Sequence, residues 1–315
     1  MTDNFRDKVY GCIFGCAVGD AMGIGTEFMT LPEIAHYYPE GLSDYSQIIR
    51  DAHRSQWPRA SWTNDTEILL VQLKAIAETS SAEAEVVAKA LKEWYTDDIH
   101  DLNSQIRNIL SNRDYLSDPY QTARETCIRM GGVKASNEAI PRIAVIGFWN
   151  DNPTETAVAN SELTNPDPVC SECARLVAKA INIMAYENRV PEPKELSEMM
   201  KKSDSRIRTG LDMAEQGKLR AMKLDDETRL WHVIKATSSA FWALWHCSSV
   251  MEGILAITAE GGDADTNAAL AGSLLGAKYG FASIPSHYID SLRRPEMLQD
   301  AAEKFADLLE LKFRS

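Results

Sequence analysis

Apolar residues recur every three or four positions along most of the chain, with charged residues between them. This spacing is typical of amphipathic helices that pack on a core. It is clearest in the stretches 65–78, 82–96, 169–187, 229–246 and 296–313. Strand-like alternation is nearly absent, although the short apolar run at 143–148 fits either an extended or a helical segment. The pattern therefore predicts an all-α fold.

The stretch from about residue 112 to 168 contains few clear helical repeats. In a helical domain, such a stretch is where loops that face the substrate are expected. No change in composition, internal repeat or low-complexity tract marks a domain boundary. We therefore expect residues 1–315 to form a single compact multi-helix domain.

Two stripes of small residues repeat at four-residue spacing. They consist of Gly11, Gly15, Gly19 and Gly23, and of Ala268, Gly272, Gly276 and Gly280. Glycine inside a helix costs about 1 kcal/mol relative to alanine, so such a stripe needs a structural reason. A smooth helix face lets another backbone approach closely, and we expect tight helix packing here. The first stripe leads through Asp20 to Glu27, and the second runs beside Asp263.

The charge balance restricts the possible partners. The chain has 33 Lys and Arg against 46 Asp and Glu, which gives a net charge of -13. This acidity argues against nucleic acid or an anionic membrane as a partner. The N-terminal residues are charged rather than apolar, and no run of about 18 apolar residues occurs. We expect the six cysteines to be buried free thiols and the protein to be cytoplasmic.

Two short segments carry acids and hydroxyls at the predicted start of a helix. The segment 62–67 reads Trp-Thr-Asn-Asp-Thr-Glu, in which Thr63 fits an ordinary helix N-cap. In the segment 260–267, Asp263 and Asp265 are two residues apart, and Thr266 is adjacent. Such carboxylates direct oxygen atoms to one spot, where a hard divalent cation neutralises them. No two histidines have metal-ligand spacing, so Mg²⁺, Mn²⁺ or Ca²⁺ fits better than Zn²⁺.

Four blocks of sequence, in this order, resemble the ADP-ribosylglycohydrolase family. They are Gly-Cys-Ala-Val-Gly-Asp-Ala-Met-Gly at 15–23 followed by Glu27-Phe28, Trp-Thr-Asn-Asp-Thr at 62–66, Ser-Asn-Glu-Ala-Ile-Pro-Arg at 136–142, and Gly-Gly-Asp-Ala-Asp-Thr at 261–266. Each block alone is weak, but four in the same order are specific. The resemblance covers about residues 10 to 290.

This resemblance implies an all-α domain with a binuclear Mg²⁺ or Mn²⁺ site at loop–helix junctions. The implied metal ligands are Thr63, Asn64, Asp65, Asp263, Asp265 and Thr266. Asp65 or Glu27 would be the catalytic base. The implied substrate-binding residues are Glu27, Ser136, Asn137, Glu138, Ala139, Arg142 and Asn165, with the diphosphate at the loop 136–142 and Arg142 assisting. The substrate would be an ADP-ribosylated protein or a small ADP-ribosyl conjugate, cleaved at ribose C1″.

The chain departs from the family pattern at several positions. Asn64 replaces the first acid of an Asp-Asp pair, which predicts weaker metal binding, and Ala264 replaces a threonine. Glu138 stands where the family has glycine, and Asn165 where many members have histidine. Three functions therefore remain open: a hydrolase of ADP-ribosyl-arginine, a hydrolase of another small ribosyl or nucleotide-like conjugate, and a protein that only binds ADP-ribose.

Three tryptophans lie on a helical pattern near residue 240. Trp231, Trp242 and Trp245 could stack on a nucleotide base, but the spacing favours positions in the core.

Overall fold

The computed structural model describes residues 2–95 and 102–313, and it confirms the all-α prediction. Within these ranges, β-structure is limited to a single antiparallel bridge between Ser136 and His232. The helices surround one continuous core and form a single domain. None of the described helices is both long and apolar enough to cross a membrane.

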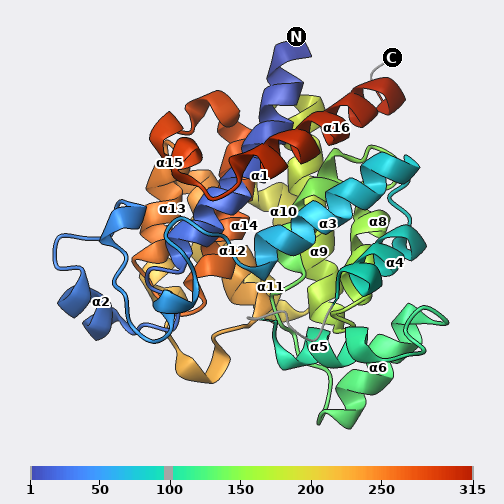
Figure 1. Ribbon diagram of the computed structural model, residues 1–315, viewed down its shortest axis with the longest axis horizontal. Coiled ribbons are helices and arrows are strands. Elements are labelled where there is room, and N and C mark those ends of the chain that lie inside the picture. The colour runs from blue at the N-terminus through green and yellow to red at the C-terminus, as the bar shows by residue number, and fades with distance from the viewer. Residues whose placement is uncertain (1, 96–101, 314–315) are drawn as a thin grey trace.

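The described residues form sixteen α-helices (Figure 1). They are α1 (Thr2–Gly23), α2 (Leu31–Tyr37), α3 (Asn64–Thr79), α4 (Ala84–Trp94), α5 (Ser104–Ser111), α6 (Pro119–Arg129), α7 (Ile140–Ile143), α8 (Pro153–Glu162), α9 (Pro168–Asn182), α10 (Pro193–Met199), α11 (Ser205–Glu215), α12 (Val233–His246), α13 (Val250–Thr258), α14 (Ala264–Tyr279), α15 (Ser286–Ser291) and α16 (Pro295–Phe313). Short 3-10 turns and one π-helical turn, Ile183–Glu187, connect or extend them.

Helices α1 and α14 form the centre of the domain. Figure 1 shows α1, in dark blue, beside α14, in orange, with α16 crossing over α1. Helices α12 and α13 pack on α14, and α3 packs against α16. Nearly every side chain of α14 is buried, which explains why this helix has no polar face in the sequence.

The five strongest helical predictions are confirmed, with ends displaced by a few residues. The predicted stretch 65–78 is α3, and 296–313 is α16. The stretch 169–187 is α9 followed by the π-helical turn. The other two are α4 and α12, which are shorter than predicted; residue 96 lies outside the described residues.

The middle of the chain is more helical than predicted. The stretch 112–168 contains α6, α7 and α8, so its description as loop-rich was wrong. Pro119 and Pro153 occupy first helical positions, where proline is favoured, instead of interrupting a helix. The ambiguous run 143–148 is helical: it ends α7 and continues as the 3-10 turn Ala144–Phe148, which is wholly buried.

The cysteines behave as predicted from their spacing. All six are buried free thiols, including Cys170 and Cys173. Burial raises the pKa of Cys173 to about 12, which keeps this thiol protonated and unreactive near neutral pH.

Candidate active site

The two glycine stripes face each other and fix the geometry of the site. A Cβ on Gly19 would lie 2.1 Å from the carbonyl oxygen of Ala268, and one on Gly23 would lie 2.3 Å from Cα of Asp265. No side chain fits at such distances, so α1 and α14 touch backbone to backbone. The predicted tight packing is confirmed. Because the helices are antiparallel, the end of α1 meets the beginning of α14, where the second acidic segment lies.

A pair of backbone hydrogen bonds joins the loop after α1 to the loop before α14. The amide of Phe28 donates to the carbonyl of Gly262 at 2.7 Å, and the amide of Gly262 donates to the carbonyl of Met29 at 3.0 Å. Gly261 and Gly262 have φ of 68° and 70°, a region that glycine adopts without strain. These bonds position Glu27 beside Asp263.

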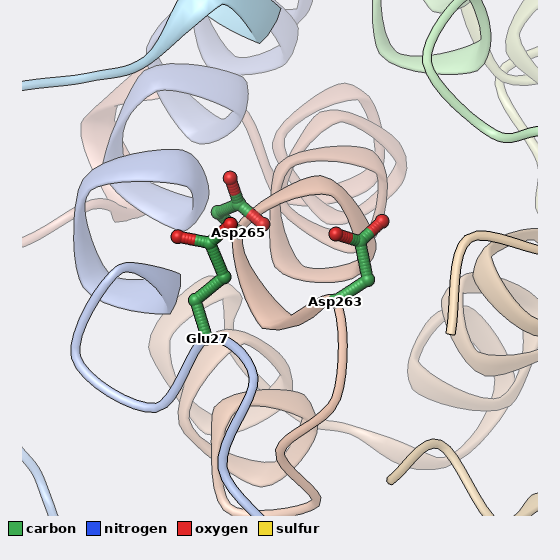
Figure 2. Close-up of side chains that lie close together, drawn as sticks. All are labelled: Glu27, Asp263 and Asp265. Carbon is green, nitrogen blue, oxygen red and sulfur yellow. The ribbon is translucent and has the colours of Figure 1, made fainter. Parts of the chain in front are cut away.

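Three acids converge at this junction (Figure 2). One carboxylate oxygen from each of Glu27, Asp263 and Asp265 lies within 4.8 Å of the others, and all three side chains are buried. Figure 2 shows Glu27 on the loop after α1, Asp263 just before α14 and Asp265 on the first turn of α14.

The first acidic segment supplies a fourth carboxylate to the same place. Asp65, in the first turn of α3, lines a cavity of about 250 Å³ together with Glu27, Asp263 and Asp265. Asn64 and Thr266 line it too. The structure thus brings together most of the predicted metal ligands. Thr63 is the exception: it does not line this cavity, and its hydroxyl accepts from the amide of Asp65 at 3.3 Å as the N-cap of α3.

A buried acid that we did not predict holds the first segment in place. Asp20 is fully buried in α1 and accepts from the amides of Thr63 and Thr66, at 3.0 and 3.1 Å. It also accepts from the Thr66 hydroxyl at 2.6 Å. Asp20 therefore orients the helix start that carries Asp65. Asp20 follows Cys12 and Cys16 at four-residue spacing, so its place on the helix face of these two expected buried thiols was a signal in the sequence that it is buried.

Burial of so many acids disfavours their charged forms. Burial, opposed by a hydrogen bond from Asn137, raises the pKa of Asp263 to about 6. The pKa of Asp65 is raised well above its usual value by burial and by the neighbouring charge of Asp20. One oxygen of Asp65, Oδ2, is buried without a hydrogen-bond donor.

This environment fits a bound cation. Five buried carboxylates, those of Glu138 and of the four acids above, line one small cavity and repel one another, and burial of a charge is costly unless it is paired. The donor set is all oxygen, which is the set preferred by hard divalent ions. The acidic cluster of the described residues could therefore hold metal, as the sequence predicted.

Two aromatic residues, Phe28 and Trp231, line the acidic cavity, and His53 contacts Glu27 and Phe28. Nε2 of His53 lies 2.7 Å from Oε2 of Glu27, and its ring packs against Phe28. Trp231 is 50% exposed and its ring centre is 6.1 Å from that of Phe28. The placement of Trp231 in the core was wrong, because it precedes α12 and belongs to the loop that faces the site. Trp242 and Trp245 do pack against the core.

The loop 136–142, for which we predicted substrate binding, reaches the acids with only some of its residues. Asn137 donates from Nδ2 to Oδ2 of Asp263, and Glu138 lines the cavity. Asn165 supports this loop from behind: it is fully buried and donates from Nδ2 to the hydroxyl of Ser136 at 2.7 Å. Ala139 is buried and does not line the cavity.

Arg142 does not face the site, which corrects the expectation that it assists at a diphosphate. Its side chain is 1% exposed, and its guanidinium donates to Gln72, to the carbonyl of Asn160 and to Thr164. Burial lowers the pKa of Arg142 to about 10. Arg142 therefore ties α7 to α3 and α8 and cannot reach a ligand in the cavity.

A second cavity adjoins the acidic one. It has a volume of about 500 Å³ and shares Asn103 and Trp231 with the acidic cavity. Its wall includes Lys134, Ser136 and Arg229, so it offers positive charge as well as apolar surface. The two cavities together are large enough for a nucleotide-sized ligand.

Comparison with known proteins identifies the family. The family model described as ADP-ribosylglycohydrolase matches residues 1–314. This chain belongs to the ADP-ribosylglycohydrolase family. The four-block resemblance is thereby confirmed.

Relatives within the family are distant. An ADP-ribosylarginine hydrolase of Serratia proteamaculans is 23% identical over 95% of this chain and 78% of its own length. The ADP-ribosyl-dinitrogen reductase glycohydrolase of Rhodospirillum rubrum is 25% identical over 91% of this chain and 90% of its own. A solved structure, an ADP-ribosylglycohydrolase-related protein complex, has a TM-score of 0.77 and 20% identity, and covers 98% of this chain and 99% of its own. That structure supports the fold alone.

Proposed function

We propose that this protein is a metal-dependent glycohydrolase that cleaves the bond between ribose C1″ and the acceptor of an ADP-ribosylated substrate. The acceptor that we favour is the side chain of arginine in a protein, so that the broken bond is N-glycosidic. The observation that carries the proposal is the convergence of Glu27, Asp65, Asp263 and Asp265 at one cavity. Two relatives have names that refer to ADP-ribosyl hydrolysis, which supports the choice of substrate.

We propose that two divalent ions, Mg²⁺ or Mn²⁺, occupy the acidic cavity. Asp263, Asp265 and Thr266 would hold one, and Asn64 with Asp65 the other. Bound there, such ions lower the pKa of water and orient the hydroxyls of the ribose. Thr63 is adjacent to Asn64 in the sequence, but its hydroxyl caps α3 and does not line the acidic cavity.

Asp65 is the general base in this proposal. Its Oδ2 is buried and has no hydrogen-bond donor, so it can accept a proton from the attacking water. The water oxygen bonds to C1″ as the bond from C1″ to the acceptor nitrogen breaks, and the leaving nitrogen takes up the proton that Asp65 accepted from the water. Glu27, which is fixed by His53, faces the same space and can orient the ribose or exchange protons there.

The second cavity is the proposed place for the rest of the ADP-ribose. Lys134 and Arg229 supply positive charge for the diphosphate, and the indole of Trp231 supplies a face for stacking. The loop residues Ser136 and Asn137 connect this cavity with the acids.

Glu138 supports a second candidate function. Its buried carboxylate lines the acidic cavity, where it opposes the approach of a phosphate. A smaller ribosyl conjugate without a diphosphate would avoid this repulsion. The third possibility, binding of ADP-ribose without turnover, is opposed by the retention of Glu27, Asp65, Asp263, Asp265 and Thr266.

The test is release of acceptor from three substrates: ADP-ribosyl-arginine, ADP-ribosyl-serine and a ribosyl-arginine that lacks the diphosphate. Each is incubated with Mg²⁺ or Mn²⁺ and, separately, with a chelator. We expect metal-dependent release from ADP-ribosyl-arginine, reduced at least a hundredfold in Asp265→Asn. Faster release from the ribosyl compound would favour the second candidate. Binding of ADP-ribose with no release from any substrate would contradict hydrolysis.

A further inference from the structure

A third cavity lies beside the acidic one, on the side of α3. It has a volume of about 460 Å³ and shares Asn64 with the acidic cavity. The acidic cavity thus lies between the other two. It adjoins the 500 Å³ cavity through Asn103 and Trp231, and it adjoins the 460 Å³ cavity through Asn64. We name the 460 Å³ cavity the α3 pocket. Its wall includes Trp57, Trp62, Glu67, Arg293 and Arg294.

The charge of the α3 pocket is unusual for this protein. The chain carries a net charge of -13, yet Arg293 and Arg294 are adjacent and both are exposed on this wall. Neither forms an ion pair within 4.0 Å with a carboxylate of the described residues. Burial raises the pKa of Glu67 and the nearby charge of Arg294 opposes that rise, so Glu67 offsets one positive charge in part. Two cationic groups therefore remain available for an anionic partner.

The backbone holds both arginines at the pocket. The amide of Arg293 donates to the carbonyl of Ala60 at 2.9 Å, which joins this turn to the segment that leads into Trp62. Arg294 has φ of 55°, the left-handed conformation that a non-glycine residue adopts only where the surroundings impose it. The half-buried rings of Trp57 and Trp62 add apolar surface next to these charges.

The position of the α3 pocket indicates which part of a substrate it meets. If the nucleotide half of the substrate occupies the 500 Å³ cavity and C1″ lies at the acids, the acceptor leaves the acidic cavity on another side. Asn64 is the shared boundary on the side of α3. We infer that the α3 pocket binds the polypeptide around the modified side chain and that Arg293 and Arg294 select acidic residues next to that side chain. This inference rests on the proposed function.

The test compares three substrates: free ADP-ribosyl-arginine, a peptide with ADP-ribosyl-arginine between two aspartates, and the same peptide with two asparagines. The variant is Arg293→Gln with Arg294→Gln. The control is Arg113→Gln with Arg124→Gln, which removes the same charge from exposed positions outside the pocket. Glutamine keeps the backbone amide of residue 293, so the bond to Ala60 is retained.

We expect the wild type and the control to have a KM for the aspartate peptide about 5 to 20 times lower than for the asparagine peptide, since an exposed ion pair contributes about two- to fivefold. In the variant this ratio should fall to about one, and turnover of free ADP-ribosyl-arginine should not change. The preference should also weaken with added salt. Equal KM values for the two peptides in the wild type, or an unchanged preference in the variant, would overturn the inference.

Failure of the proposed function gives a different result. In that case no substrate, including free ADP-ribosyl-arginine, is hydrolysed by the wild type. The inference is then decided by binding of the unmodified aspartate peptide, labelled with a fluorophore and followed by anisotropy. Tighter binding to the wild type than to the Arg293→Gln, Arg294→Gln variant supports a site for acidic polypeptide, and equal binding overturns it.

Discussion

The two acid-bearing helix starts, those of α14 and α3, are held in different ways. The start of α14 is pressed against the glycine stripe of α1, where a Cβ on Gly23 would lie 2.3 Å from Cα of Asp265. The start of α3 is held through hydrogen bonds to one buried carboxylate, that of Asp20. The first arrangement is steric and involves the whole helix, whereas the second depends on a single side chain. We therefore expect changes at α14 to affect folding and changes at α3 to affect mainly the site.

The largest effect should come from filling the glycine stripe. Gly19→Ala places a Cβ 2.1 Å from a carbonyl oxygen of α14, and backbone cannot yield as a side chain does. We expect a loss of about 3 kcal/mol or more in the free energy of unfolding, measured with urea. Gly41→Ala is the control: nothing lies within 4 Å, so only its φ of 83° is strained, which costs about 1 kcal/mol. Equal losses in the two variants would contradict close backbone packing.

The next effect is the dependence of stability on pH when metal is removed. Burial raises the pKa of Asp263 to about 6, against about 3.9 in an unfolded chain. Because the folded protein binds this proton more tightly, the protonated carboxyl of Asp263 stabilises the fold fully at a pH below the pKa of the unfolded chain. That stabilisation is lost as the pH rises through the pKa of the folded protein. In the presence of chelator, titration of Asp263 should lower the free energy of unfolding by about 2 to 3 kcal/mol between pH 4 and pH 7. Asp263→Asn should lack that loss, as shown by urea unfolding at several pH values.

A smaller effect is expected at the start of α3. Asp20→Asn leaves one acceptor oxygen for three donors, so Asp65 should be less firmly placed. We expect affinity for Mn²⁺, measured by calorimetry, to fall about tenfold with little loss of fold. Asp7→Asn is the matched control, since Asp7 also accepts from a backbone amide but lies at the far end of α1. A similar fall in the Asp7 variant would show that the effect is not local.

The smallest effect should come from restoring an acid at Asn64. Asn64→Asp adds a negative charge at the edge of the acidic cavity. If Asn64 is a ligand, affinity for Mn²⁺ should rise a few fold, and turnover should rise with it. If affinity for Mn²⁺ does not change, residue 64 does not touch the ion.

The fold and the acidic centre could be predicted from the sequence because they depend on local patterns. Apolar periodicity predicted five of the long helices, and the four-residue spacing of glycine predicted that the segments of α1 and α14 each pack closely against another helix. The direction of individual side chains could not be obtained in this way. Arg142 follows a recognisable loop but turns inward to Gln72, and Trp231 fits a helical pattern but lies before the helix begins. Such outcomes depend on contacts between residues far apart in the sequence.

The site was also incomplete without the structure. Asp20 acts through hydrogen bonds to a helix 43 residues further along the chain, and no short motif encodes that contact. His53 meets Glu27 only because the loop between α2 and α3 returns to the site. Asp20 and His53 are both polar residues that the sequence shows, but the spacing of residues along the chain did not indicate which residue each of them contacts.

We propose that the two helix starts, those of α3 and α14, hold divalent metal together. Anomalous diffraction from crystals grown with Mn²⁺ tests it most directly. We expect anomalous peaks within about 2.0 to 2.6 Å of carboxylate oxygens from both Asp65 and Asp265. Peaks that touch only the α14 side, or no peak in the acidic cavity, would contradict it.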